Sequence, residues 1–289
     1  MLVRIVVGVI CALFAIGLLT LIGNGLGAFV CIVVALVSAL CVHEIMGVSQ
    51  CKNKILTWVN MIFAFCVPLY IGFDLERFIP VAPGLIIGIY ILAVLILMLK
   101  TFDCTKFENV AIGLFASIVI PVSASSLLLT YEFMDKYPQI FSKSSEVFVI
   151  LMAMYCAWLC DTFCLFSGMA FGKHKLAPNI SPKKTIEGSV GGVIGTTVFA
   201  LVTWAIFNKW FFRFDTIKWW MVLIIVPVVC VMGMFGDLSA SVLKRNYGVK
   251  DYGTLLPEHG GAMDRIDSYL FTMPTTYIIV RILTELLVK

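Results

Sequence analysis

The sequence predicts an all-α, polytopic integral membrane protein, a helical bundle that crosses a bilayer about nine times. Of its 289 residues, 61% are hydrophobic and only 13% are charged, whereas soluble domains carry about 25% charged residues. The mean hydropathy is +1.03. Apolar runs recur along the chain, each long enough for the roughly 20 residues of a spanning helix, and they do not alternate as membrane β-strands do. A water-soluble fold is therefore excluded.

The apolar runs define the predicted helices in order, to within a few residues at each end. We expect spans at 2–22, 26–48, 55–73, 78–99, 109–131, 146–171, 188–208, 218–243 and 268–288. The first run exceeds the roughly 7–15 residues of a signal-peptide core, so we expect it to be retained as a helix. The early links are short and favour antiparallel neighbours, whereas the links 172–187 and 244–264 are long and polar.

The two polar links lie in one half of the chain. Residues 1–131 hold about five spans, and residues 132–289 hold about four spans with both polar links, so we assign catalysis to the C-terminal half. Basic residues favour the side of the N-terminus and the polar links, which predicts that this side is cytoplasmic and the C-terminus external. The short length and the ten cysteines, which form no CxxC pair and suit helix packing, favour the inner membrane of a bacterium.

Four aspartates stand out because acidic side chains in or beside membrane spans are costly. Asp161 lies inside an apolar stretch, and Asp237 lies near the inner end of the eighth span. Asp264 and Asp267 open the ninth span, three residues apart and therefore on one helical face. For one acid alone, a helix cap or an interhelical hydrogen bond is an equal alternative. Four acids that converge on one face favour a functional site.

Basic residues crowd the same part of the sequence. The bases in or directly beside the two polar links are Lys173, Lys175, Lys183, Lys184, Lys244, Arg245, Lys250 and Arg265. The turn His259-Gly260-Gly261 precedes the last helix, and the oriented N–H groups of such a turn suit a bound phosphate. Contact of the bases with anionic lipid head groups is the alternative, which we favour for Lys173 and Lys175 taken alone.

Carboxylates mixed with bases indicate a task other than lipid contact. Carboxylate oxygens hold Mg²⁺, which clamps phosphate oxygens, and lysine and arginine neutralise the remaining phosphate charge. The pattern therefore predicts phosphoryl or nucleotidyl transfer to a membrane-borne substrate, without identifying that substrate.

The stretch from Ser241 to Asp267 closely resembles the signature of the phosphatidate cytidylyltransferases, also called CDP-diacylglycerol synthases. It contains S-x2-K-R-x4-K-D, then P-x-H-G-G and D-R-x-D. A second block, from Asp161 to Gly188 and including Ser-Pro-Lys-Lys-Thr at 181–185, looks like the other polar segment of the family. Ala262 and Ile186 depart from the usual family residues. The first half of the chain matches only as a pattern of apolar helices.

The resemblance implies that CTP and phosphatidic acid give CDP-diacylglycerol and pyrophosphate, by in-line attack of the lipid phosphate on the α-phosphorus of CTP. It implies Mg²⁺ and a second cation such as K⁺. The expected partners are CTP, phosphatidic acid and membrane lipids, with no nucleic acid; a second copy of the chain, forming a homodimer, is a further candidate.

The resemblance also assigns roles to individual residues. The implied catalytic set consists of Asp237, Asp264, Asp267, Lys244 and His259. The implied metal ligands are Asp237 and Asp264 first, then Asp267 and Asp161. The implied substrate- and phosphate-binding residues are Ser181, Lys184, Thr185, Ser241, Arg245, Lys250, Gly260, Gly261 and Arg265. His259 would donate a hydrogen bond to pyrophosphate or stabilise its turn. The roles of Asp251 and Glu44 stay open.

Two other functions compete with this reading. A CTP-dependent polyprenol or phytol-type lipid kinase would transfer the γ-phosphate to an alcohol, and the complete C-terminal signature argues against it. A membrane transporter would also place charges in its spans, but typically near the midplane on broken helices, whereas these charges lie toward one face.

Overall fold

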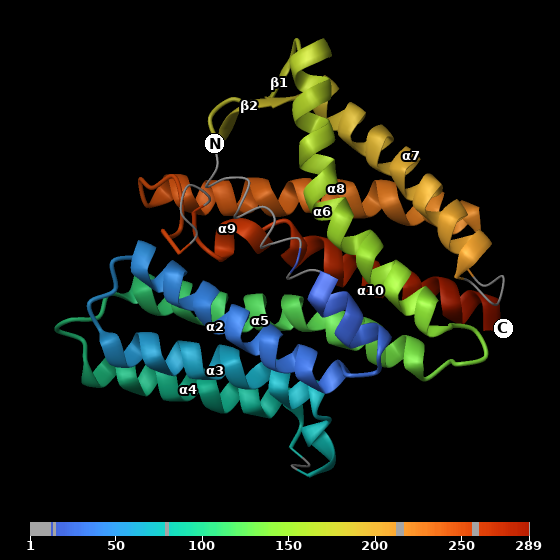
Figure 1. Cartoon of the computed structure of the whole chain (residues 1–289). Helices are drawn as coiled ribbons and strands as arrows, with labels where there is room; N and C mark the ends of the chain where they lie inside the picture. Colours follow the sequence, from blue (N-terminus) through green and yellow to red (C-terminus); the bar gives the residue numbers. More distant parts are fainter. Residues whose placement is uncertain (1–12, 14–15, 79–80, 212–216, 256–259, 289) are drawn as a thin grey trace. The chain divides into compact units, whose positions relative to one another are not determined.

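The computed structural model describes residues 13, 16–78, 81–211, 217–255 and 260–288. The described chain is almost entirely helical (Figure 1). The long helices are α2 (Gly27–Val48), α3 (Lys54–Gly72), α4 (Pro83–Lys100), α5 (Phe107–Asp135), α6 (Lys143–Phe171), α7 (Ile186–Trp210), α8 (Trp219–Asn246) and α10 (Tyr269–Val288). The short elements are the 3-10 turn η1 (Leu75–Arg77), the strands β1 (Lys175–Ala177) and β2 (Ser181–Thr185), and the helix α9 (Met263–Ile266).

Seven of the described helices, α2 to α8, are long and apolar enough to cross a membrane. Each coincides with a predicted span, so the prediction of an all-α polytopic membrane protein is confirmed. Of the first predicted span, only residues 13 and 16–22 are described, and these are helical; the rest lies outside the described residues. The last predicted span forms α10, which is not among the seven.

The chain folds into two compact units, each described here by itself. Unit 1 comprises residues 1–21, 26–128 and 246–266, and unit 2 comprises residues 22–25, 129–245 and 267–289. One change of unit, at 128/129, lies close to the predicted division at 131/132, which stays a prediction. The segment 246–266, which follows α8 in sequence, belongs with the N-terminal helices in unit 1.

Buried polar side chains tie together the helices of unit 1. The hydroxyl of Tyr90 on α4 contacts Asn60 Oδ1 on α3 and Ser117 Oγ on α5, each at 2.5 Å. Asn53 caps the start of α3 by accepting from two backbone N–H groups, and its amide donates to Thr101 Oγ1 at 2.8 Å. Because an unpaired polar group inside a membrane is costly, these bonds specify which helices are neighbours.

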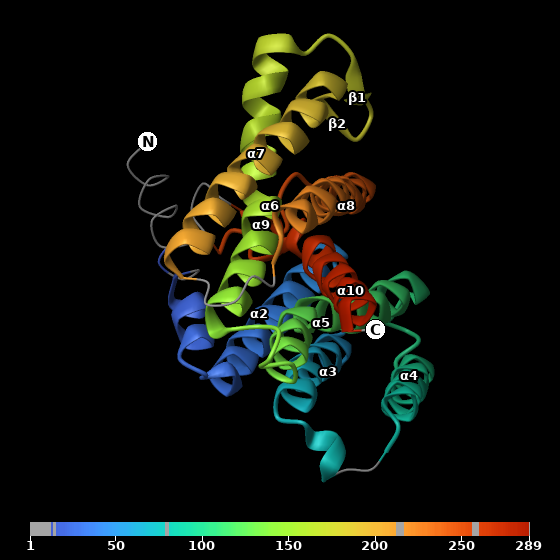
Figure 2. The same ribbon diagram turned by 90° about the vertical axis from the view of Figure 1, so that its right-hand side faces the viewer.

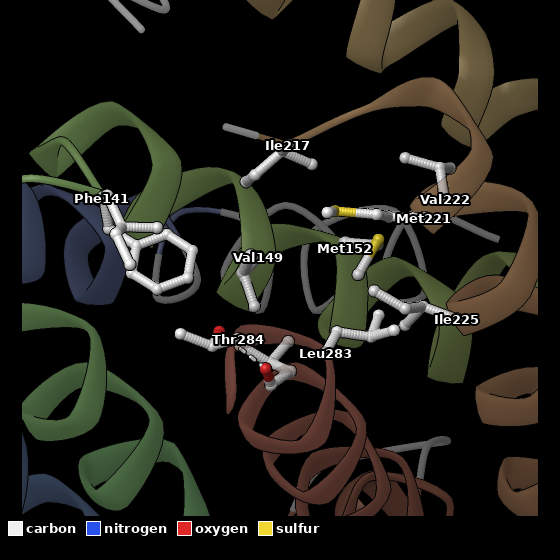
Figure 3. Close-up of a pocket in the computed structure, with 11 residues that line it drawn as sticks. Phe141, Val149, Met152, Ile217, Met221, Val222, Ile225, Leu283 and Thr284 are labelled. Carbon is white, nitrogen blue, oxygen red and sulfur yellow. Dashed lines mark hydrogen bonds between the residues drawn. The ribbon is translucent and has the colours of Figure 1, made fainter. Parts of the chain in front are cut away.

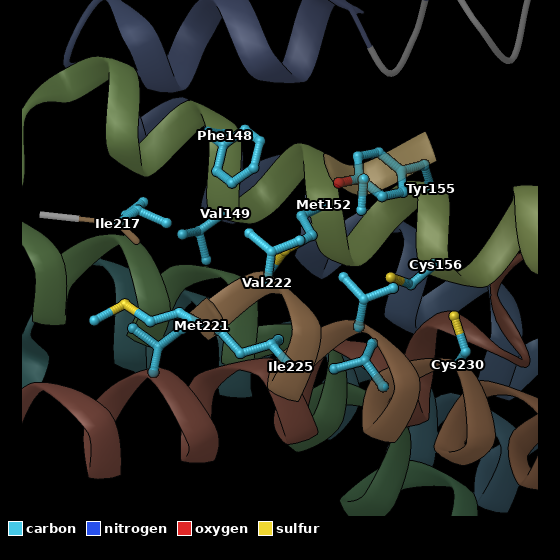
Figure 4. Packing of buried hydrophobic residues seen from close by; sticks show 14 of the residues in the cluster. Phe148, Val149, Met152, Tyr155, Cys156, Ile217, Met221, Val222, Ile225 and Cys230 are labelled. Atoms are coloured by element: carbon cyan, nitrogen blue, oxygen red, sulfur yellow. The ribbon is translucent and has the colours of Figure 1, made fainter. Parts of the chain in front are cut away.

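Unit 2 is built around the packing of α6 against α7 (Figure 2). Their contact runs from Gly168 beside Gly188 to Phe148 beside Phe207, whose ring centroids are 5.2 Å apart. The core between α6 and α8 consists of large apolar side chains and small thiols, among them Met152, Cys156, Val222, Ile225 and Cys230 (Figure 4). All the described cysteines are free thiols, and five of them, Cys31, Cys41, Cys156, Cys160 and Cys230, are buried.

A cavity in unit 2 is lined by Phe141, Val149, Met152, Ile217, Met221, Val222, Ile225, Leu283 and Thr284, with Ile140 and Val280 (Figure 3). Thr284 supplies the one polar side chain of this lining. This cavity has no charged side chain in its lining, so it does not suit the phosphate chemistry that the sequence predicts.

The polar link 172–187 folds into a small antiparallel hairpin that the sequence did not predict. Strand β1 pairs with β2 in the register Lys175 to Thr185 and Ala177 to Ser181. The second strand ends at Thr185, whose side-chain oxygen accepts from Gly188 N at 3.1 Å and so caps α7. The hairpin is thereby joined directly to the start of a membrane helix.

Candidate active site

The charged side chains of Lys184, Asp161 and Asp237, which come from three elements of unit 2, lie close together. This lysine lies on β2, and its ammonium contacts Asp237 Oδ2 on α8. The same nitrogen lies 3.7 Å from Asp161 Oδ1 on α6. The family resemblance assigns Lys184 to phosphate binding and both aspartates to metal binding. The structure brings all three together, with the lysine and Asp237 side chains only 20% and 22% exposed.

Close helix contact explains how a lysine on a hairpin reaches these acids. A Cβ at Gly188 would lie 2.7 Å from the carbonyl oxygen of Cys164, and a Cβ at Gly168 would lie 2.9 Å from Thr185 Oγ1. The absence of side chains at both positions lets the start of α7 touch the end of α6. Lys184, one residue before the cap of α7, is then held beside Asp161.

The electrostatic setting keeps Lys184 charged. Burial by itself lowers the pKa of an ammonium, but the negative charges of Asp161 and Asp237 outweigh burial here, so the pKa of Lys184 is raised. The side chain is therefore protonated at neutral pH. It acts as a hydrogen-bond donor and a positive charge, and not as a general base.

Asp267 is a third carboxylate near this pair in unit 2. It lies in the turn between α9 and α10 and is 8% exposed, and its Oδ1 accepts from Ser268 N at 2.7 Å. Burial, together with the negative charges of Asp237 and Asp161, raises the pKa of Asp267 to about 7. The expectation that Asp264 and Asp267 share one helical face is wrong, because the turn at 267–268 ends α9.

The donors in unit 2 suit magnesium by type. Among the described residues, no group of three or more His, Cys, Asp or Glu side chains has the geometry of a metal site. Mg²⁺, however, usually takes one or two protein carboxylates and completes its shell with water and substrate phosphates. Asp161 and Asp237 already flank one cation, the Lys184 ammonium, so this pair fits the expected ion. The metal-ligand assignments stay predictions.

Asp264 organises the signature loop, residues 247–262 between α8 and α9, within unit 1. Its Oδ2 accepts from Tyr252 N at 2.8 Å and from Gly261 N at 2.9 Å, which closes the loop on itself. Gly260 has a φ of +80°, a backbone conformation that a side chain would strain. The sequence predicts that the N–H of Gly261 binds a phosphate. In the structure this N–H donates to the Asp264 carboxylate.

Glu44, whose role the sequence left open, reaches the same loop from α2. Its Oε1 accepts from Ala262 N and its Oε2 from Met263 N, each at 2.8 Å. The only signal in the sequence was an acid beside His43 near the end of an apolar run. That signal could not reveal the partner, because the partner lies more than 200 positions away along the chain.

The other predicted site residues lie on β2, on α8, in the signature loop and on α9. Ser181 lies on β2, and Ser241, Lys244 and Arg245 lie in the last two turns of α8. In unit 1, Lys250 and Asp251 are exposed in the signature loop, and Arg265 is exposed on α9. His259 lies outside the described residues.

Comparison with known proteins gives consistent results. Residues 2–283 match a family model described as the cytidylyltransferase family. The phosphatidate cytidylyltransferase of Staphylococcus epidermidis is 34% identical over 243 residues, covering 76% of this chain and 89% of that protein. Proteins of the same name from Thermotoga maritima and Staphylococcus saprophyticus are 38% and 43% identical over 46% and 48% of this chain. In these two comparisons the match spans about half the relative's length, 49% and 51%.

Proposed function

The chain belongs to the cytidylyltransferase family, and from that premise we propose that it transfers the cytidylyl group of CTP to phosphatidic acid. The products are CDP-diacylglycerol and pyrophosphate. The observation that carries the proposal is the convergence of Lys184 with Asp161 and Asp237. Lys184 and Asp161 lie in one of the two segments that resemble the family, and Asp237 lies just before the other.

The reaction needs positioning and charge neutralisation more than covalent chemistry. An oxygen of the lipid phosphate attacks the α-phosphorus of CTP, the bond from that phosphorus to the bridging oxygen breaks, and pyrophosphate leaves with the bonding electrons. The lipid phosphate is already ionised near neutral pH, so no strong general base is required. A lysine that keeps its proton, as Lys184 does, suits this scheme because it can donate to phosphate oxygens throughout.

Magnesium is part of the proposal. Asp161 and Asp237, with Asp267 and Asp264 as further candidates, would hold it, and the bound ion would supply positive charge to the phosphates of CTP. A second cation such as K⁺ follows from the family resemblance. Lys244, Arg245, Lys250 and Arg265 would neutralise the remaining phosphate charge.

The proposed location is the cytoplasmic face of a bacterial inner membrane. The chain is an integral membrane protein, and the basic residues of its polar links favour the cytoplasmic side. CTP is a cytoplasmic metabolite, which agrees with that orientation. Membrane lipids and phosphatidic acid would reach the protein from within the bilayer.

The test follows pyrophosphate and CDP-lipid together, with purified protein in detergent, phosphatidic acid, CTP and Mg²⁺. We expect equal amounts of both products, and Asp237→Asn should retain less than about a tenth of the turnover while remaining folded. Glu285→Gln is the matched control, because Glu285 pairs with Arg281 on the surface of α10 at 3.0 Å. CDP and a phosphorylated alcohol, formed when a polyprenol is added, would instead identify a kinase, and Asp237→Asn with normal turnover would remove Asp237 from the site.

A further inference from the structure

The carboxylate of Glu44 holds the start of the short helix α9 in unit 1. The first N–H groups of a helix have no partner within it, so another group must accept from them. Glu44 accepts from Ala262 N and Met263 N with one oxygen each, both at 2.8 Å. Hydrogen bonds to an ionised carboxylate are shorter and stronger than those between neutral groups.

Two glycines of the loop are pressed against the same carboxylate. A Cβ at Gly253 would lie 2.8 Å from Glu44 Oε1, and a Cβ at Gly261 would overlap both carboxylate oxygens. Ordinary contacts of a Cβ are longer than 3.4 Å, so a side chain at either position would displace Glu44 or the loop. Gly253, near the start of the loop, and Gly261, near its end, therefore both lie against the Glu44 carboxylate.

Glu44 and Asp264 share the task of holding this loop. Gly261, Ala262 and Met263 are consecutive, and their three N–H groups all donate to carboxylates, the first to Asp264 and the next two to Glu44. A shift of the backbone at 262–263 would move Gly261 and the start of α9, which carries Asp264. The position of the Asp264 carboxylate thus depends on Glu44.

We propose that Glu44 is a positioning residue for cytidylyl transfer, which fixes the Asp264-bearing segment through its backbone and does not itself touch substrate. The inference rests on the proposed function. It predicts a graded response. Glu44→Gln keeps one acceptor oxygen and should lose about tenfold in turnover, whereas Glu44→Ala loses both acceptors and should lose about a hundredfold.

The first test combines turnover with hydrogen exchange of the wild type and of both Glu44 variants, in detergent. The backbone amides of 262 and 263 should exchange faster in Glu44→Gln, while amides of α6 and α7 keep their protection. The matched control is Glu76→Gln, an exposed acid of η1 in the same unit. Equal, complete loss in both Glu44 variants with unchanged exchange would overturn the proposal and assign Glu44 a direct chemical role.

The second test uses the glycine contact. Gly253→Ala should reduce turnover in the wild type because its Cβ displaces the Glu44 carboxylate, but should cost little in the Glu44→Ala background, where that carboxylate is gone. Additive losses would contradict the proposal. A wild type that makes no CDP-lipid would refute the proposed function, whereas an active wild type with a fully active Glu44→Gln would refute the positioning role alone.

Discussion

Replacement of Lys184 by methionine separates the charge of this residue from its bulk. Methionine keeps a similar length but leaves Asp237 partly buried without its partner. Breaking a buried ion pair from one side costs about 3–5 kcal/mol, and the lower end applies here because both side chains retain some exposure. The contact with Asp161 adds little, about 1 kcal/mol or less, because that side chain is 47% exposed and screened by solvent.

Three effects should therefore follow in one variant. Without Mg²⁺, Lys184→Met should unfold at a lower temperature, in line with a loss of about 3 kcal/mol. Added Mg²⁺ should stabilise the variant more than the wild type, because the ion no longer competes with an ammonium between Asp161 and Asp237. CTP binding and turnover should nonetheless fall, since a phosphate-neutralising charge is lost.

Thermal unfolding in detergent across a magnesium titration measures the first two effects, and CTP titration measures the third. Lys183→Met is the matched control, because this neighbouring lysine of β2 is exposed. Weaker stabilisation of Lys184→Met by Mg²⁺ than of the wild type would refute the reasoning, since it would show that the aspartate pair is not the cation site. An unchanged CTP titration would refute the phosphate role.

Three further substitutions test helix contacts, one beside the site in unit 2 and two in unit 1. Gly188→Ala should lower both turnover and stability by about 1–3 kcal/mol, because its Cβ meets the carbonyl of Cys164; wild-type melting and turnover would contradict this. Asn53→Ala should cost about 1–2 kcal/mol of stability through the lost cap of α3, measured by thermal unfolding, with KM for CTP unchanged. Tyr90→Phe should cost about 1–3 kcal/mol by stranding the buried Asn60, with turnover per folded molecule unchanged.

The membrane helices could be predicted from the sequence because bilayer thickness sets their length. The predicted span 109–131 corresponds to α5, and the predicted span 218–243 corresponds to α8, each within a few residues. Local composition decides these elements, so no knowledge of their neighbours was needed. The convergence of acids and bases was also foreseeable in outline, since charge is rare in such a chain.

The rest of the site depends on contacts that local patterns do not encode. The hairpin β1–β2 is short and polar, so it has no alternating apolar pattern to reveal it. The ion pairs of Lys184 arise because glycines allow α6 and α7 to approach, which only the packed helices show. Glu44 accepts hydrogen bonds from backbone N–H groups, so the residue types in the sequence do not reveal this contact.

The most direct test of the proposed reaction asks which phosphorus of CTP reaches the lipid. Purified protein is given phosphatidic acid, a polyprenol and Mg²⁺ with CTP labelled at either the α- or the γ-phosphorus, and the lipid fraction is extracted and counted. Cytidylyl transfer predicts that the α-label enters the lipid while the γ-label leaves as pyrophosphate. Entry of the γ-label into lipid, with the α-label recovered in CDP, would contradict the proposed function and identify a CTP-dependent kinase.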